Sequence, residues 1–326
     1  MTFGIMLNLA ALLAVIAWLL GRAYPATEAV RLRNALLLEP GTGDDFSWTP
    51  ENMPSDFRRE RRSAGPELAG AVRALGLDRL AEDWRKALAL AGHLTEHAAA
   101  DEDDAGPVQS DLLTTYRSIR EGHGYCADFV KVYLALAQAA GLAARQWAFS
   151  FDGFGGHGHT FVEVFDRRHA KWLFLDVFNN FHAVATSTGE PLGALELRSL
   201  LQDRPGDVRF DANGPGRPGF IYPEKAFDYY RRGLSEWYLW WGNAVISADA
   251  NPVTRWASRL GGGLGRLASM FLGGQPRIRI LRTEENRAQA ESLARLRDRV
   301  RLAIVVLVLL AGCLAAQFAF MRSPST

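Results

Sequence analysis

The sequence predicts an α+β fold in which one buried helix packs against an antiparallel sheet, with further helices around this core and two membrane helices. An apolar pattern of helical period covers residues 126–140. Three runs of strand length, rich in β-branched and aromatic residues, follow it at 142–151, 158–165 and 170–178. Uncharged apolar stretches at 3–20 and 302–320 lie near the two ends of the sequence.

Each terminal stretch is long enough to cross a bilayer, because about 20 apolar residues span the hydrocarbon core. The first has no basic segment before it, and the "GRA" at 21–23 is a poor cleavage site, which favours a retained anchor over a signal peptide. The basic segment 295–301 precedes the second. Basic residues are concentrated between the two stretches, so the positive-inside rule predicts a cytoplasmic central region, with a periplasmic one as the alternative.

The composition argues against two classes of protein, nucleic-acid binders and disulfide-rich scaffolds. The 326 residues have a net charge of +1, which gives no long-range field of the kind that attracts nucleic acid. The two cysteines are Cys126 and Cys313, and the second lies in the C-terminal apolar stretch. A disulfide between them is implausible, so the chain is not a disulfide scaffold.

The remaining segments are predicted from periodicity and from Gly and Pro punctuation. We expect helices at 26–37, 66–75, 77–99, 109–120 and 224–247. We expect loops at 40–65, 100–107 and 205–219, and a flexible glycine-rich rim at 154–158. A helix over 255–272 is expected either on the membrane surface or as an ordinary packed helix.

Cys126 follows a glycine-rich turn and opens the predicted helix 126–140. Free N–H groups and the helix dipole stabilise an anion at a helix start, and a thiolate is such an anion. The glycines of the turn leave room for a substrate to approach the sulfur. Asp128, in the same first turn, is expected to cap the helix rather than to react.

Two strands supply partners for the thiol. Residues of alternate position share a strand face, which puts His159 on one face of its strand and Asp176 on one face of the next. If residues 166–169 form the hairpin loop, Phe165 pairs with Ala170, and His159 lies opposite Asp176. These residues would act as nucleophile (Cys126), base and acid (His159) and orienting carboxylate (Asp176).

Four blocks in this order resemble the transglutaminase-like superfamily of papain-related thiol enzymes over residues of about 109–180. The blocks are "GYCADF" (124–129), "GLAAR" (141–145), "HTFVEV" (159–164) and "WLFLD" (172–176). The resemblance implies catalytic roles for Cys126, His159 and Asp176. The chain departs from the family pattern at Phe161, where tryptophan is usual, and at Val177, where proline is usual.

The predicted activity is that of a membrane-anchored cysteine hydrolase or acyltransferase, of a bacterial inner-membrane type, that acts on amide bonds of a protein or peptide and needs no cofactor or metal. We further expect Tyr125, His157, Gly158 and Trp172 to contact the substrate. The expected divisions are an anchor (1–22), a helical region with a polar linker (23–108), the catalytic core (109–204), an aromatic-rich membrane-proximal region (205–300) and a second membrane helix (301–321).

Other functions remain open. The same domain could be catalytically inactive and bind a partner in a membrane assembly, such as one that handles cell-surface polymers. "HLTEH" supplies His93, Glu96 and His97 for a zinc peptidase, although an amphipathic helix explains it more simply.

Two further patterns have alternative explanations. A zinc site could also form from Cys126 with the three histidines at 123, 157 and 159. Trp237, Trp240 and Trp241 would share a face of the predicted helix 224–247 and could bind sugars, lie at the membrane interface or pack inside.

Overall fold

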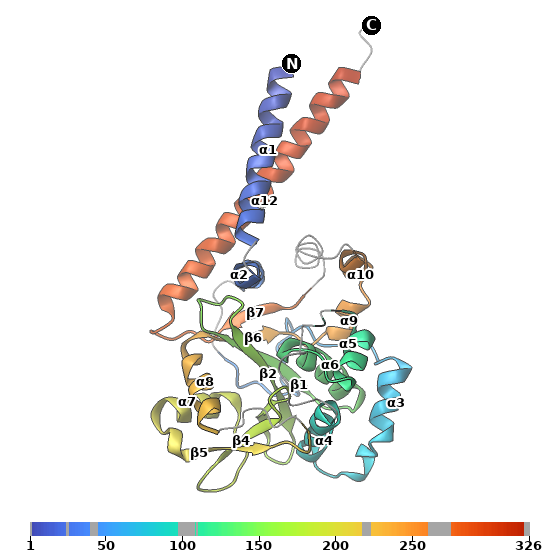
Figure 1. Ribbon diagram of the computed structural model, residues 1–326, viewed down its shortest axis with the longest axis vertical. Helices are drawn as coiled ribbons and strands as arrows, with labels where there is room; N and C mark the ends of the chain where they lie inside the picture. Colours follow the sequence, from blue (N-terminus) through green and yellow to red (C-terminus); the bar gives the residue numbers. More distant parts are fainter. Residues whose placement is uncertain are drawn as a thin grey trace.

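The computed structural model describes residues 2–23, 26–39, 45–96, 108, 110–216, 223–259 and 275–322. It shows a mixed helix and antiparallel-sheet domain, from which two long helices project side by side (Figure 1). The predicted α+β fold is therefore confirmed. The elements below are all within the described residues.

One seven-stranded sheet forms the centre of the domain, with the strand order β5-β4-β3-β2-β1-β6-β7. Neighbouring strands are antiparallel throughout. The strands are β1 (Ala144–Ser150), β2 (Gly158–Asp166), β3 (Lys171–Asp176), β4 (Phe181–Ala185), β5 (Val208–Ala212), β6 (Trp237–Trp241) and β7 (Arg277–Ile280).

Helices surround this sheet (Figure 1). They are α1 (Thr2–Ala23), α2 (Ala26–Leu37), α3 (Pro66–Ala74), α4 (Asp83–Thr95), α5 (Leu112–Arg120), α6 (Cys126–Ala139), α7 (Ala194–Asp203), α8 (Pro223–Arg232), α9 (Val245–Asp249), α10 (Pro252–Arg259) and α12 (Arg287–Arg322). The predicted helices at 26–37, 66–75, 109–120 and 126–140 are confirmed within a few residues. The one predicted at 77–99 begins later, at Asp83, after a short 3-10 turn, and residues 97–99 lie outside the described part.

The two faces of the sheet bury different cores, because side chains alternate along each strand. Val162 and Leu175 face α6 in an aliphatic core that also holds α3, α4 and α5. Phe161 and Phe174 face the other way, into an aromatic core with residues of α7 and α8. The strands at the centre are therefore covered on both sides, and β2 and β3 are buried at nearly every position.

The predicted helix over 224–247 is wrong in its second half. Helix α8 ends at Arg232, and residues 237–241 form β6, which pairs with β1 on one side and β7 on the other. A run of tryptophan, tyrosine and leucine fits a strand that is buried on both faces. Trp237 and Trp241 consequently lie in the aromatic core, while Trp240 faces the opposite side of the sheet.

Two predicted loops contain more structure than expected. Residues 208–212 form the edge strand β5. In the segment 45–65, three aromatic residues are buried in the aromatic core, because their large apolar surfaces are removed from water there. They are Phe46, Trp48 and Phe57.

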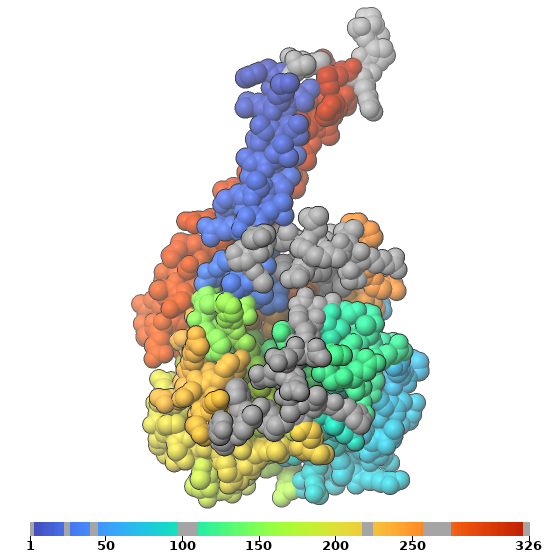
Figure 2. Space-filling model, viewed as in Figure 1, coloured from blue at the N-terminus to red at the C-terminus, as the bar shows by residue number. Residues whose placement is uncertain are grey.

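Helices α1 and α12 are long and apolar enough to cross a membrane, and almost no residue of the two apolar stretches is buried. They project from the domain as an antiparallel pair (Figure 2), and the Asn8 side chain donates to Gln317 at 3.2 Å. Only the C-terminal half of α12 is apolar, so its charged N-terminal half belongs to the domain.

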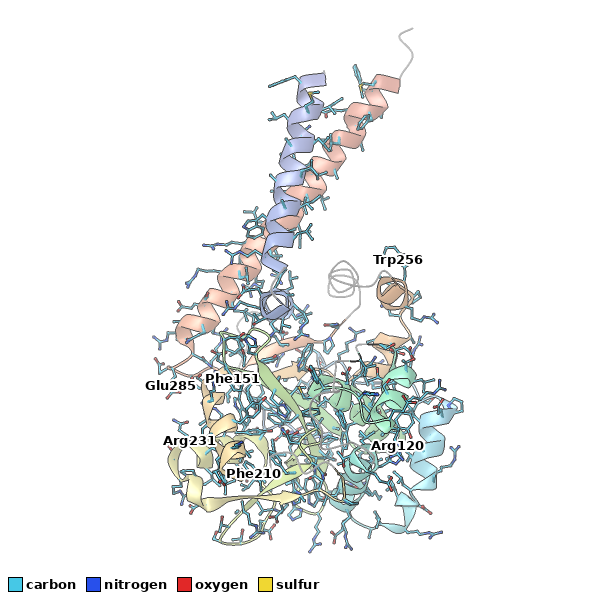
Figure 3. All side chains as sticks on the ribbon, viewed as in Figure 1. Arg120, Phe151, Phe210, Arg231, Trp256 and Glu285 are labelled. Carbon is cyan, nitrogen blue, oxygen red and sulfur yellow. The ribbon has the colours of Figure 1, made fainter. Side chains whose placement is uncertain are left out.

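On α10, Trp256 is exposed at the same end of the domain (Figure 3). The rest of the predicted helix 255–272 lies outside the described residues.

Candidate active site

Cys126 is the first residue of α6, and the turn before it fixes where the helix begins. Gly124 has a φ of 116°, a region that favours glycine. The Asp128 carboxylate then accepts the N–H of Tyr125 at 3.0 Å and that of Val108 at 3.0 Å. The expected capping role of Asp128 is confirmed. The side chain of Cys126 is half-buried at this helix start.

The predicted register of the hairpin is wrong by two residues. Asp166 pairs with Lys171, so the loop is 167–170 rather than 166–169. Asp166 stays in the strand because its buried carboxylate accepts the N–H groups of Trp84 and His169, both at 2.9 Å. A shift of two residues preserves strand faces, so His159 and Asp176 still share a face, as diagonal rather than directly opposed neighbours.

His159 and Asp176 form a buried hydrogen-bonded pair. Nε2 of the ring lies 2.8 Å from Oδ2 of the carboxylate, and both side chains are almost inaccessible to solvent. Asn179 donates its side-chain amide to the same oxygen at 2.7 Å and its backbone N–H to Oδ1 at 3.0 Å. The hydroxyl of Tyr230 also donates to Oδ2 at 2.8 Å. The carboxylate is thus held in one orientation by four donors.

The electrostatics favour a charged pair. Burial alone would lower the pKa of His159, but the negative charges of Asp176 and Cys126, and hydrogen bonds with both, raise it to about 10. Burial alone would raise the pKa of Asp176, yet the charge and hydrogen bond of His159, aided by Asn179, lower it below its usual value. The arrangement therefore stabilises an imidazolium beside a carboxylate.

The ring of His159 lies between the carboxylate and the thiol. Because Nε2 is engaged by Asp176, Nδ1 is the nitrogen that remains for the sulfur of Cys126. Aromatic rings enclose the imidazole, with ring centroids 5.8 Å away for Phe149, 5.7 Å for Tyr229 and 6.2 Å for Phe178. This apolar enclosure excludes water from the pair and strengthens the attraction between its charges.

The four expected substrate contacts occupy different positions. Tyr125 precedes Cys126 and is 46 % exposed. Gly158 precedes His159 and its carbonyl accepts the Tyr229 hydroxyl at 3.2 Å. His157 is largely exposed and lies 3.1 Å from a carboxylate oxygen of Asp152.

Trp172 is not at the site. It lies at the far end of β3, where its indole N–H donates to the carbonyl of Trp48 at 2.5 Å and its ring lies under the guanidinium of Arg145. Arg145 in turn forms a buried ion pair with Glu163 at 2.7 Å. Trp172 therefore belongs to the aromatic core, and its expected contact with substrate is corrected to a packing role.

Three residues of the site escaped the sequence analysis. Asn179 and Tyr230 donate to the Asp176 carboxylate, and Asn213 donates to the Asp176 carbonyl at 3.0 Å. Asn179 lies three residues after Asp176, and an aspartate side chain often accepts a backbone N–H of the turn that follows it. This contact was therefore predictable from the local sequence. Tyr230 is 54 positions away in the sequence and gave no such signal.

The alternative metal sites gain no geometric support from the part of the chain that the structure describes. Within those residues, no group of three or more His, Cys, Asp or Glu side chains is arranged to hold a metal ion. Nε2 of His93 lies 2.9 Å from the Tyr116 hydroxyl, and Glu96 lies 3.4 Å from Arg120. His97 is outside the described residues.

Two cavities lie away from the thiol. One of about 940 Å³ lies between β7 and the charged half of α12. A second, of about 290 Å³, is lined by Trp48 and Trp172 at the hairpin end of the sheet. Neither includes Cys126, His159 or Asp176 in its lining, so the candidate site is identified by the geometry of these three side chains.

Comparison with protein families gives one match. The model of the transglutaminase-like superfamily matches residues 72–177, about a third of the chain, and this range contains Cys126, His159 and Asp176. No curated protein and no solved structure matches the sequence. The match begins in α3, earlier than the motifs alone indicated. Residues 72–177 therefore contain a transglutaminase-like domain.

Proposed function

We propose that the chain is a membrane-anchored thiol hydrolase or acyltransferase that acts on amide bonds of a protein or peptide. The observation that supports it best is the position of the His159 ring, between the buried Asp176 carboxylate and the Cys126 thiol at the start of α6. A helix start beside a protonated imidazole is the setting in which a thiolate is stable and nucleophilic.

The chemistry follows from these positions. The thiolate of Cys126 attacks the amide carbon, and the carbonyl electrons move to oxygen, where the free N–H groups of the α6 first turn stabilise the charge. When the C–N bond breaks, the leaving nitrogen takes the proton from Nδ1 of His159. Water or an amine then gives a proton to His159, attacks the thioester and releases the thiolate. Hydrolysis results with water, and acyl transfer with an amine.

Asp176 has a supporting part in this scheme. Its carboxylate fixes the ring so that Nδ1 faces the sulfur and stabilises the imidazolium while the proton is held there. The donors from Asn179 and Tyr230 keep the carboxylate ionised and immobile. Their role is positioning.

We also propose that α1 and α12 anchor the domain in a bilayer, with the domain on the cytoplasmic side. The supports are the two exposed apolar stretches and the excess of arginine at their domain-side ends. Labelling of single cysteines, introduced on the domain surface, with a membrane-impermeant maleimide would test the side. Labelling of intact cells or spheroplasts from outside would contradict a cytoplasmic domain.

The catalytic proposal is tested with an electrophilic acyl probe that labels activated thiols. We expect the full chain to be labelled at Cys126, and Cys126→Ala to remove both the label and amide-bond cleavage. Cys313→Ala is the matched control, since that thiol lies in α12, and should retain the full label. A folded chain whose Cys126 reacts no faster than a free thiol would favour an inactive binding module instead.

A further inference from the structure

A small cavity lies where the two membrane helices meet the domain. Its volume is about 100 Å³. Side chains of α1, α2 and α12 line it, including Trp18, Arg22, Glu28, Arg31, Arg295 and Arg299. Four arginines and one glutamate thus converge from the consecutive helices α1 and α2 and the distant helix α12. None of these residues belongs to the candidate active site.

The cavity has an excess of positive charge. Glu28 pairs with Arg31 at 2.9 Å, which accounts for the one carboxylate. Arg295 forms only an exposed pair with Glu291, at 3.5 Å. Among the residues that the structure describes, Arg22 and Arg299 form no ion pair. Arg22, Arg295 and Arg299 are exposed, so the group carries an excess of positive charge that is accessible to an anionic ligand.

The level of the cavity along the helical pair identifies the source of that charge. Arg22 ends the apolar part of α1, and Arg299 lies three residues before the apolar stretch of α12 begins. Trp18 is 38 % exposed one turn before Arg22, in the position typical of an aromatic belt. In a bilayer, this level is occupied by lipid headgroups rather than by acyl chains or bulk solvent.

We infer that this cavity binds the phosphate group of an anionic phospholipid. Its volume corresponds to about three water molecules, which suits a phosphodiester and leaves the rest of the headgroup outside. Guanidinium groups bind phosphate oxygens in bidentate fashion, and basic pockets between membrane helices favour lipids with net negative charge. The inference requires the proposed membrane location but not the proposed catalysis.

The test measures lipid retention on the purified full chain by native mass spectrometry. Phosphatidylglycerol and phosphatidylcholine with identical acyl chains are compared, followed by the double variant Arg22→Gln/Arg299→Gln. We expect wild type to prefer phosphatidylglycerol, and the double variant to bind it roughly 30-fold more weakly with phosphatidylcholine retention unchanged. The matched control is Arg287→Gln/Arg301→Gln, which removes the same charge from α12 outside the cavity lining and should keep the preference.

Each outcome decides the inference. Equal binding of the two lipids by wild type would overturn it without reference to any variant. An equal loss in the control variant would show diffuse surface charge rather than a site. Displacement of the lipid by millimolar inorganic phosphate would identify free phosphate as the ligand. If the chain leaves membranes on carbonate extraction, the membrane location fails, and this result is independent of the activity of Cys126.

Discussion

Replacing Asp176 by asparagine should uncouple the imidazole from the thiol. In the native site, Oδ2 of Asp176 receives three donors, from His159, Asn179 and Tyr230, and Oδ1 receives one. An amide of the same shape has one acceptor oxygen and one N–H₂ group. Whichever way it is oriented, a donor then faces a donor, and the negative charge that holds the imidazolium is lost.

The size of the effect follows from the His159 pKa. Its rise from 6.5 to about 10 corresponds to roughly 5 kcal/mol in favour of the protonated ring. Asp176 is the largest of the contributions that raise this pKa, and the burial that lowers it remains when the carboxylate is removed, so the pKa of His159 should return to its usual value or below. A ring that is no longer protonated at neutral pH does not stabilise the thiolate. The alkylation rate of Cys126 at pH 7 should therefore fall about 30-fold, because an unactivated thiol is only about 3 % ionised at that pH.

The assay needs no substrate. Iodoacetamide alkylation of Cys126 is followed by peptide mass spectrometry across pH, and the Cys313 peptide reports background reactivity. Asp166→Asn is the matched control, because it removes another buried carboxylate of the same hairpin that has no contact with the site. It should lose stability and keep the pH profile of Cys126. A folded Asp176→Asn chain with an unchanged profile would refute the reasoning.

Three further predictions concern stability and local geometry. Tyr230→Phe removes one charged hydrogen bond to Asp176 and should lower the free energy of unfolding by about 1.5–3 kcal/mol in urea, while a fall below 0.5 kcal/mol would contradict the bond. Gly158→Ala should reduce both expression and alkylation, because an added Cβ would collide with the carbonyl oxygen of Phe149. The folded pKa of His159 lies above its unfolded value, so its contribution to stability is full below pH 6.5 and is lost as pH rises toward about 10. Thermal unfolding in detergent should show this alkaline loss, and it should disappear in Asp176→Asn.

The periodicity of apolar residues predicts those features of the site that lie within a single helix or strand. The change from a glycine-rich turn to an apolar helical pattern predicts that Cys126 starts a helix. In the structure, α6 begins at Cys126. His159 and Asp176 were placed on a common face by alternation, which survives the two-residue error in register. The register is wrong because the prediction treats Asp166 as a turn residue. In the structure, its buried carboxylate accepts the N–H of Trp84, a residue too distant in sequence for local periodicity to reveal the contact.

Long-range contacts account for what the sequence did not predict. Tyr230 reaches Asp176 because α8 packs across the aromatic face of the sheet, and that docking depends on elements distant in sequence. The prediction of a helix at residues 237–241 is wrong because, over five residues, the spacing of tryptophan and leucine fits the helical period and the strand period equally well. Residues 237–241 form a strand because β1 and β7 make backbone hydrogen bonds with them on both sides.

The glycine-rich segment before His159 shows how the N-terminal helices and the candidate site are connected. It was expected to be a flexible rim, but its backbone is held on two sides. Two N–H groups, those of Gly153 and Phe154, donate to the buried Glu236 carboxylate at 2.8 and 2.9 Å. Phe154 is itself fully buried, with a φ of 63°. Such a conformation persists only where its surroundings determine it.

Helix α2, which follows α1, supplies the other side of this support. Nε of Arg31 donates to the carbonyl of Gly153 at 2.9 Å, and the Thr27 hydroxyl accepts the N–H of Gly156 at 2.9 Å. Each such bond contributes only about 0.5–1.5 kcal/mol, but glycine residues lose much conformational entropy when they are fixed. The bonds from α2 offset that loss at the residues that lead directly into β2. The starting point of the strand that holds His159 is therefore set in part by α2.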